Sequence, residues 1–151
     1  MKRIGIIADT HGALNANIFK IFKDVDMIIH AGDVVGEDVL TDLRTISVVV
    51  AVFGNMDTSF WSKNLKEEID LEVEGKKINV SHKTPIPLKK GYDIVIRGHT
   101  HKPEINTFGR TLFINPGSAN PAKSIPDNKP SVAMLEIDNG KTDVKLVFYR
   151  P

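Results

Sequence analysis

The sequence predicts an α/β fold in which two β-sheets pack face to face with helices outside. In the first third of the chain, three short apolar segments alternate with two segments of helical spacing, the pattern of a parallel α/β unit. From Ile69 onward, paired segments are joined by turns that contain glycine, which is typical of antiparallel hairpins. The 151 residues contain no linker or low-complexity tract, so we expect one domain, residues 1–151.

The parallel unit is predicted from apolar runs and helical periodicity. The apolar runs are rich in Ile and Val, as buried strands are, and the segments between them place apolar residues on one helical face. Strands are expected at residues 3–8, 27–30 and 48–53, and helices at residues 15–22 and 37–44.

The remainder is predicted as hairpins around one further strand. The β-branched run at residues 94–96 is expected to be a buried strand that ends at Gly98. Hairpins are expected at residues 69–73 with 77–80, at 104–108 with 111–114, and at 131–137 with 142–149. Residues 84–90 are expected to form a loop or a single helical turn, and residues 115–130 an irregular stretch.

Composition and charge exclude several classes of function. The formal net charge is +1, so we expect no extended nucleic-acid-binding surface and no attraction to an anionic membrane. The longest apolar runs are far shorter than the roughly 18 residues of a membrane span. Cysteine is absent, which excludes disulfides and thiolate metal sites, and cytoplasmic residence is the default expectation. Whether the chain forms a homo-oligomer stays open.

Metal-ligating residue types follow the ends of the predicted strands. Some of them directly follow a glycine that ends an apolar run, and ligands of open α/β sheets sit beyond the carboxyl ends of the strands. They number seven, more than the four donors of one tetrahedral ion, so two ions that share a bridging carboxylate fit better. The candidate metal ligands are Asp9, His11, Asp33, Asn55, His82, His99 and His101.

The donor chemistry predicts a cationic site for an anion. Two divalent ions, the carboxylates of Asp9 and Asp33, and a bridging hydroxide add to about +1, which suits a phosphate ester. Oxygen and imidazole donors without thiolate suit Mn²⁺, Ni²⁺, Co²⁺, Fe or Zn²⁺, and we expect Mn²⁺ first.

Structural alternatives exist for individual residues. Asp9 alone would serve as a helix cap, Asn55 as a turn residue, and the histidines as solvated loop residues. His30 lies inside a strand, and we expect a hydrogen-bonded core histidine there rather than a metal ligand. Asp57 is expected either to brace a ligand or to be a solvated turn residue.

Four further side chains near the site have two readings each. Lys83 and Arg97 flank candidate ligands and would suit a substrate phosphate, although long cations near loops are more often surface residues. Phe60 and Trp61 would suit stacking on a substrate ring, but we expect both in the core.

Taken in order, these motifs resemble those of the calcineurin-like metallophosphoesterases. The chain reads Asp9-x-His11, Gly32-Asp33, Gly54-Asn55, His82 and Gly98-His99-x-His101. Its length, and Asn115-Pro116-Gly117-Ser118 after the last motif, resemble the small YfcE-type phosphodiesterase branch, which also includes a retromer subunit that uses this fold as a scaffold.

The resemblance implies a four-layer α/β/β/α sandwich of two mixed sheets flanked by helices, with a dinuclear site. By carry-over, Asp9, His11, Asp33 and His101 hold one ion, and Asp33, Asn55, His82 and His99 hold the other. Asp33, Asn55 and His99 are also expected to act in catalysis.

The function expected from this resemblance is the hydrolysis of a small phosphodiester, with a nucleotide as one candidate, by a hydroxide that bridges two metal ions. The alternative is a protein-binding scaffold of the retromer-subunit type. Met56 stands where the wider superfamily carries a histidine that protonates the leaving group, and a thioether donates no proton, which argues against a phosphomonoesterase. His82 is followed by Lys83 instead of the usual glycine, and only fifteen residues separate it from Gly98, so we expect an open, shallow cleft.

Overall fold

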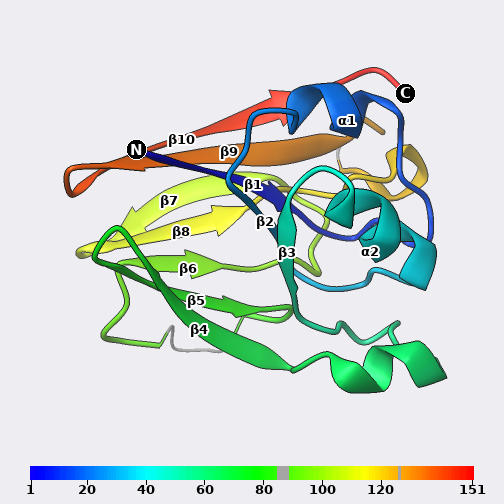
Figure 1. Cartoon of the computed structure of the whole chain (residues 1–151), viewed down its shortest axis with the longest axis horizontal. Helices are drawn as coiled ribbons and strands as arrows, with labels where there is room; N and C mark the ends of the chain where they lie inside the picture. Colours follow the sequence, from blue (N-terminus) through cyan, green and yellow to red (C-terminus); the bar gives the residue numbers. More distant parts are fainter. Residues whose placement is uncertain (85–88, 126) are drawn as a thin grey trace.

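The computed structural model of the protein describes residues 1–84, 89–125 and 127–151. Two mixed five-stranded sheets lie face to face, as the sequence predicts (Figure 1). Helices α1 (Asn17–Ile21) and α2 (Glu37–Arg44) pack on the outer side of the first sheet. Within the described ranges, no helix combines the length and apolarity that crossing a membrane requires.

The first sheet joins the predicted parallel unit to the last hairpin of the chain. Its strands β1 (Lys2–Ile7), β2 (Met27–His30) and β3 (Val48–Ala51) run parallel, with Ile4 opposite Met27 and Met27 opposite Val48. The closing hairpin adds two antiparallel strands on the other side of β1. The order across the sheet is β10 (Lys141–Phe148), β9 (Ser131–Asp138), β1 (Lys2–Ile7), β2 (Met27–His30) and β3 (Val48–Ala51).

The second sheet has a parallel centre and antiparallel edges. Its central strand, β6, is parallel to both of its neighbours, and each edge strand forms a hairpin with the strand beside it. The order across the sheet is β4 (Glu68–Val73), β5 (Lys76–Ser81), β6 (Ile94–Ile96), β8 (Thr111–Asn115) and β7 (Glu104–Phe108). Strands β1, β2, β3, β5 and β6 therefore each leave their sheet into a loop that carries candidate ligands.

Two apolar cores hold the layers together. Between the sheets, β-branched side chains such as Ile6, Ile29 and Ile96 are fully buried and in one cluster. On the outer side of the first sheet, Phe22 and Leu40 pack with Ile28 in a second cluster. Burial of an aliphatic or aromatic side chain contributes about 1.5–3 kcal/mol, so these clusters give the strand ends a rigid base.

The predicted strands and helices are present, with bounds that coincide or differ by one or two residues, but two short helices were not predicted. The 3₁₀ helices are η1 (Phe60–Asn64) and η2 (Pro121–Lys123). Trp61 packs against the helix-side core as expected, whereas the prediction for Phe60 is wrong, because its side chain is 83% exposed. Residues 85–88 and 126, within the expected loop and irregular stretch, lie outside the described residues.

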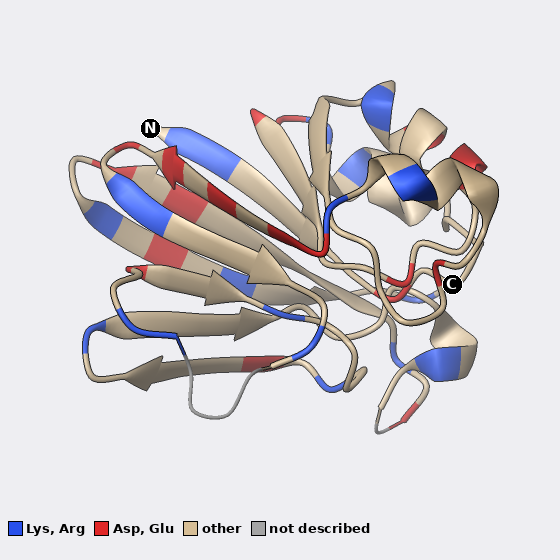
Figure 2. Ribbon diagram, turned by 90° about the horizontal axis from the view of Figure 1, so that it is seen from below, with Lys and Arg blue, Asp and Glu red and all other residues tan. Residues whose placement is uncertain are grey.

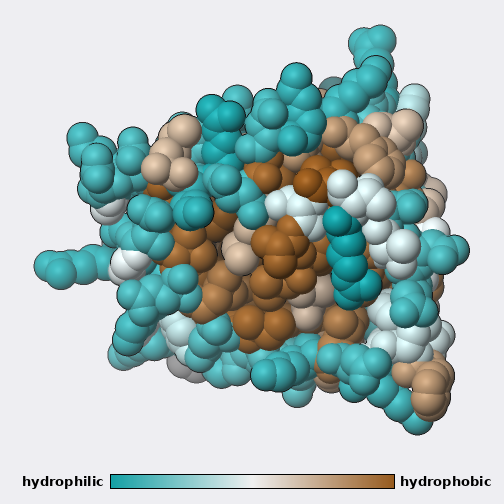
Figure 3. Space-filling model, in the orientation of Figure 1, coloured by the Kyte–Doolittle hydropathy of each residue, from teal (hydrophilic) through white to brown (hydrophobic). Residues whose placement is uncertain are grey.

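The surface mixes charges of both signs and includes an apolar area on the face viewed in Figure 1. Figure 2 shows Lys and Arg interspersed with Asp and Glu along the ribbon, in keeping with the small net charge. Figure 3 shows apolar side chains in the middle of the face viewed in Figure 1, where the edge strands β3 and β4 lie. Val48 is exposed there, and the apolar residues of β4 are only half-buried.

Candidate metal centre

The strand ends bring all seven candidate ligands to the same end of the sandwich. The β1 and β2 loops lie side by side, because the Asp9 N–H donates to the Gly32 carbonyl at 3.0 Å and the His11 N–H donates to the Asp33 carbonyl at 3.1 Å. The β6 loop joins them through the His99 N–H, which donates to Asp9 Oδ2 at 3.1 Å. Residues from three separate loops thus surround the Asp9 carboxylate.

The side chains form two groups that share one carboxylate. Asp9, His11, Asp33 and His101 form the first group, and Asp33, His82 and His99 the second; within each group one donor atom per residue lies within 4.8 Å of the others. The Asn55 Oδ1 atom lies 3.1 Å from His99 Nδ1, which places it beside the second group. The first group has the residues of one ligand set that the resemblance implies, and the second has those of the other set except Asn55, with Asp33 common to both.

Two buried polar atoms in this cluster suit a bound cation. Within the part of the chain that the structure describes, Asp9 Oδ1 and His82 Nε2 have no hydrogen-bond partner. Burial, opposed by His82 and reinforced by Asp33, raises the pKa of the Asp9 carboxyl to about 7. Buried polar atoms without a partner are costly, and a divalent ion would bind the lone pairs of both atoms and restore the Asp9 charge. The residues present therefore fit a metal ion.

Hydrogen bonding aims the His82 ring into the cluster. Its Nδ1 atom lies 2.8 Å from the Ala31 carbonyl oxygen, which can only accept, so Nδ1 carries the proton and Nε2 presents a lone pair. This Nε2 lies 3.2 Å from Asp33 Oδ2. A histidine held in this tautomer by a backbone carbonyl is the usual arrangement of a metal ligand.

The backbone of the candidate ligands is unusual. Five of the seven have positive φ: Asp9 (52°), His11 (47°), Asp33 (54°), His99 (74°) and His101 (62°). Residues other than glycine avoid this region, and strained backbone of this kind tends to cluster at functional sites. The fold thus holds these residues in a conformation that is uncommon for residues other than glycine.

Two glycines allow the loops to approach so closely. A Cβ atom at Gly54 would lie 2.2 Å from Asp33 Oδ1, and one at Gly32 would lie 2.6 Å from His82 Nδ1. Side chains at these positions would push apart the loops that carry the second group. The glycines before Asp33 and Asn55 therefore have a packing reason in addition to their role at the strand ends.

Asp57 braces two of the ligand loops, which decides between its two readings. Its side chain is 8% exposed, so it is not a solvated turn residue. Oδ1 accepts a hydrogen bond from the Val35 N–H at 2.8 Å, and Oδ2 accepts from the N–H groups of Gly54 at 2.8 Å and Val34 at 3.2 Å. One carboxylate thereby ties the loop after Asp33 to the loop before Asn55, and it holds Val35 at a φ of 55°.

We expect Asp57→Asn to destabilise the protein by about 2 kcal/mol, because one acceptor oxygen becomes an amide that faces backbone N–H groups. Urea denaturation of chelator-treated protein measures the change. Asp42→Asn, on the exposed side of α2, is the matched control and is expected to change stability by less than about 0.5 kcal/mol. Equal denaturation midpoints for the Asp57 variant and the wild type would contradict the bracing role.

The two candidate cations differ in position. Lys83 is exposed and lines a hollow of about 280 Å³ together with Asn55 and His82. Arg97 is fully buried, so the expectation of a surface residue is wrong. Its guanidinium donates to Asn79 Oδ1 at 2.5 Å and to the Ile96 carbonyl at 2.9 Å, so these contacts hold it within the second sheet.

Several residues that support the site carry no specific signal in the sequence. Ser118 Oγ donates to the Asp9 carbonyl at 2.8 Å, and Asn120 Nδ2 donates to the Thr10 carbonyl at 3.2 Å. Asn115 Nδ2 donates to the Gly98 carbonyl at 3.0 Å. From the sequence, the Asn-Pro-Gly-Ser stretch supported only the family resemblance and predicted no structural role for this region.

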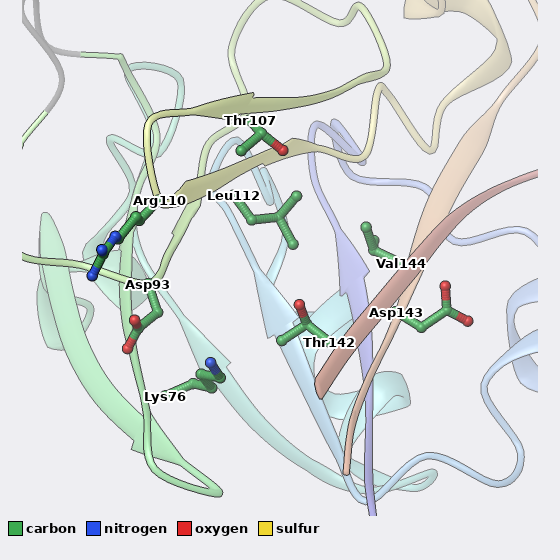
Figure 4. Close-up of a pocket in the computed structure, with 8 residues that line it drawn as sticks. All are labelled: Lys76, Asp93, Thr107, Arg110, Leu112, Thr142, Asp143 and Val144. Carbon is green, nitrogen blue, oxygen red and sulfur yellow. The ribbon is translucent and has the colours of Figure 1, made fainter. Parts of the chain in front are cut away.

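A second hollow lies at the opposite end of the sandwich. It measures about 380 Å³ and is lined by residues that begin strands or lie in turns, among them Lys76, Asp93 and Arg110 (Figure 4). Leu112 of β8 and Val144 of β10 lie on its two sides. None of the seven candidate ligands lines it, so it is separate from the metal cluster.

Comparison with known sequences identifies the family. The profile of the calcineurin-like phosphoesterase superfamily domain matches residues 1–140. The chain belongs to this superfamily. Calcineurin-like phosphoesterases are hydrolases that use divalent metal ions, which agrees with the cluster described above.

Relatives of this phosphoesterase domain align with three quarters or more of its length. The chain is 34% identical to a probable metallophosphoesterase of Methanothermobacter thermautotrophicus, over 95% of this chain and 91% of the relative. It is 34% identical to a phosphodiesterase of Methanocaldococcus jannaschii, over 76% and 82% of the two chains. Among solved structures, zinc-bound Vps29 of Entamoeba histolytica is 25% identical with a TM-score of 0.78, over 97% and 98% of the two chains.

Proposed function

We propose that the protein is a phosphodiesterase that hydrolyses P–O bonds at a dinuclear metal centre. In this proposal Asp9, His11, Asp33 and His101 hold one divalent ion, and Asp33, Asn55, His82 and His99 hold the other. Mn²⁺ is the ion that we expect first. The oxygen and imidazole donors also suit Ni²⁺, Co²⁺, Fe and Zn²⁺. When bound, two such ions would activate a water molecule as the nucleophile and would supply positive charge that offsets the charge on the phosphoryl oxygens.

The observation that carries the proposal is the pair of donor groups that share Asp33. A single group would support one ion, whereas two groups with a common carboxylate suit a pair of ions clamping one phosphate. The unpartnered Asp9 Oδ1 and His82 Nε2 atoms, noted above within the described residues, add to this argument. Asn55 and His99 are exposed at the rim, where they would meet the substrate beside Asp33.

The hydroxyl groups that support the loops are already engaged and do not serve as nucleophiles. Thr10 Oγ1 donates to the Val34 carbonyl at 3.0 Å, and Ser118 Oγ donates to the Asp9 carbonyl. The sequence contains no cysteine. The chain's own contribution is therefore to hold donors, orient the substrate and stabilise charge, which together suffice for phosphoryl transfer.

Met56 supports a diester over a monoester substrate. Its N–H donates to Asp33 Oδ1 at 2.9 Å, and its side chain is 52% exposed, so it lies at the rim beside the shared carboxylate. A thioether cannot protonate a leaving oxygen. Esters with leaving groups of low pKa, such as aryl diesters, should therefore react far better than alkyl monoesters.

We expect Met56→His to narrow the gap between aryl and alkyl leaving groups, because general acid catalysis contributes about 10²–10⁴-fold. The measurement is kcat/KM for esters whose leaving groups have graded pKa values. Met56→Gln, of similar length but unable to act as an acid, is the matched control and should keep the wild-type slope. An unchanged slope for Met56→His, with both ions still bound, would refute a role of this position in substrate choice.

One assay tests the proposed function as a whole. Purified protein loaded with Mn²⁺ is offered cyclic nucleotides, aryl diesters and aryl monoesters, and its metal content is measured in parallel. We expect hydrolysis of diesters with two ions per chain. Metal-loaded protein that cleaves none of these esters would overturn the proposal.

The second candidate function is a protein-binding scaffold, which the similarity to Vps29 structures favours. Exposed apolar side chains near the candidate ligands, those of Val35 and Met56, also suit a protein contact. All seven candidate ligands are present, however, and a scaffold has no chemical need for them. Absence of hydrolysis in the assay above would favour the scaffold.

A further inference from the structure

A buried hydrogen-bond chain passes through both ligand loops that leave the first two strands. It begins at the Gly32 N–H, which donates to His30 Nδ1 at 3.2 Å. His30 Nε2 lies 3.1 Å from Thr10 Oγ1, and Thr10 Oγ1 donates to the Val34 carbonyl at 3.0 Å. Both His30 and Thr10 are fully buried. His30 is thus the hydrogen-bonded core histidine that the sequence predicts.

The hydrogen bonds of this chain all run in one direction, and this determines the tautomer of His30. A backbone N–H can only donate, so Nδ1 must accept, and Nε2 must carry the ring proton. Thr10 Oγ1 accepts the hydrogen bond from His30 Nε2. Its own hydroxyl then donates to the Val34 carbonyl, which can only accept. Burial also lowers the pKa of His30 to about 3, in agreement with a neutral ring.

The members of this chain bracket the candidate ligands. Thr10 stands between Asp9 and His11 on the first loop, and Gly32 and Val34 stand on either side of Asp33 on the second. The two loops are also paired by backbone hydrogen bonds, including the Gly12 N–H to the Val34 carbonyl at 2.8 Å. Within the described parts of the chain, His30 and Thr10 make the only side-chain hydrogen bonds between these two loops that do not use a candidate ligand.

We propose that His30 and Thr10 are a positioning pair that sets the spacing between the Asp9–His11 loop and Asp33, and thereby the affinity for metal. The inference rests on the proposed metal centre but not on the reaction. Removing a group that orients metal ligands typically weakens metal affinity by about 10–100-fold. Neither residue touches the substrate or the ions.

The test is the affinity for Mn²⁺, measured by titration calorimetry on protein stripped with a chelator. Thr10→Val keeps the shape of the side chain but removes the hydroxyl, and we expect it to raise the Kd of at least one Mn²⁺ ion by about 10–100-fold. Thr10→Ser restores a hydroxyl and should bring the Kd back to within about threefold of the wild type. Such rescue would not follow from a packing role of the methyl group.

The matched control is Thr111→Val at the far end of the sandwich. The Thr111 hydroxyl is part-buried and donates to the Tyr92 carbonyl at 2.7 Å, so the same atoms are exchanged away from the site. We expect its Mn²⁺ Kd to equal that of the wild type. Thermal unfolding of each metal-free variant shows whether stability and affinity change separately.

His30→Leu breaks the same hydrogen-bond chain at the histidine. It provides the test if the Thr10→Val variant does not fold. We expect a similar loss of affinity, and the double variant should lose no more than either single one, since one chain is broken in each case. If the wild type binds Mn²⁺ while the folded variant of either residue binds it equally well, the positioning role is overturned and the metal centre stands. If the wild type binds no divalent ion, both the inference and the proposed function fall.

Discussion

Asp33→Ala is expected to lower kcat/KM for an aryl diester by at least about 10³-fold, equivalent to roughly 4 kcal/mol of transition-state stabilisation. Asp33 belongs to both donor groups, so its loss removes a ligand from each proposed ion and the negative charge between them. It also removes the acceptor of the Met56 N–H at 2.9 Å. Metal analysis should therefore find fewer than two ions per chain.

Two further variants separate charge from shape at this position. Asp33→Asn keeps an acceptor for the Met56 N–H but cannot supply an anionic bridge, so we expect it to be nearly as inactive as the alanine variant. Asp38→Ala, an exposed carboxylate in the first turn of α2, should leave activity and metal content unchanged. If Asp33→Ala retains both ions and normal activity, the ligand assignment is wrong.

Removal of metal is expected to abolish activity, and addition of Mn²⁺, Ni²⁺ or Co²⁺ to restore it. The physical reason is that the hydroxyls of Thr10 and Ser118 are engaged in hydrogen bonds and the sequence has no cysteine to act as a nucleophile. The ions should also stabilise the fold, by about 2.7 kcal/mol when their concentration is 100 times the Kd. Rates and melting temperatures before and after chelation measure both effects.

The control for this experiment is chelated protein whose residual metal is quantified. Re-addition of Mg²⁺, which prefers oxygen ligands and retains its waters, should restore less activity than Mn²⁺, because the proposed site is rich in imidazole. Undiminished hydrolysis at a metal content near zero would rule out a metal-dependent reaction.

The sequence was sufficient to predict the strands and the convergence of the candidate ligands, because both follow from local patterns. Apolar runs that end in glycine mark strand ends, and the carboxyl ends of neighbouring parallel strands share one sheet edge. The prediction that His30 is a core residue succeeded for the same reason, since it lies inside such a run.

What the sequence did not predict depends on contacts between distant segments. The Asp57 carboxylate accepts hydrogen bonds from N–H groups 22 and 23 residues away, and no local sequence pattern predicts partners at that separation. Arg97 follows a strand like a surface residue but is buried against Asn79, 18 residues earlier. Phe60 was expected inside because it is aromatic, yet the η1 turn leaves it exposed. Tertiary packing overrides the preference of the single residue in each case.

The left-handed backbone of five candidate ligands lowers the stability of the fold, whereas their side chains are the ones proposed to bind metal ions. Each such residue costs on the order of 1 kcal/mol that glycine at the same position would not, and the fold bears this cost before any ion arrives. Drift toward greater stability would therefore discard these side chains first in a lineage that no longer used the ions. Under the proposed function, the free energy of ion binding offsets this cost.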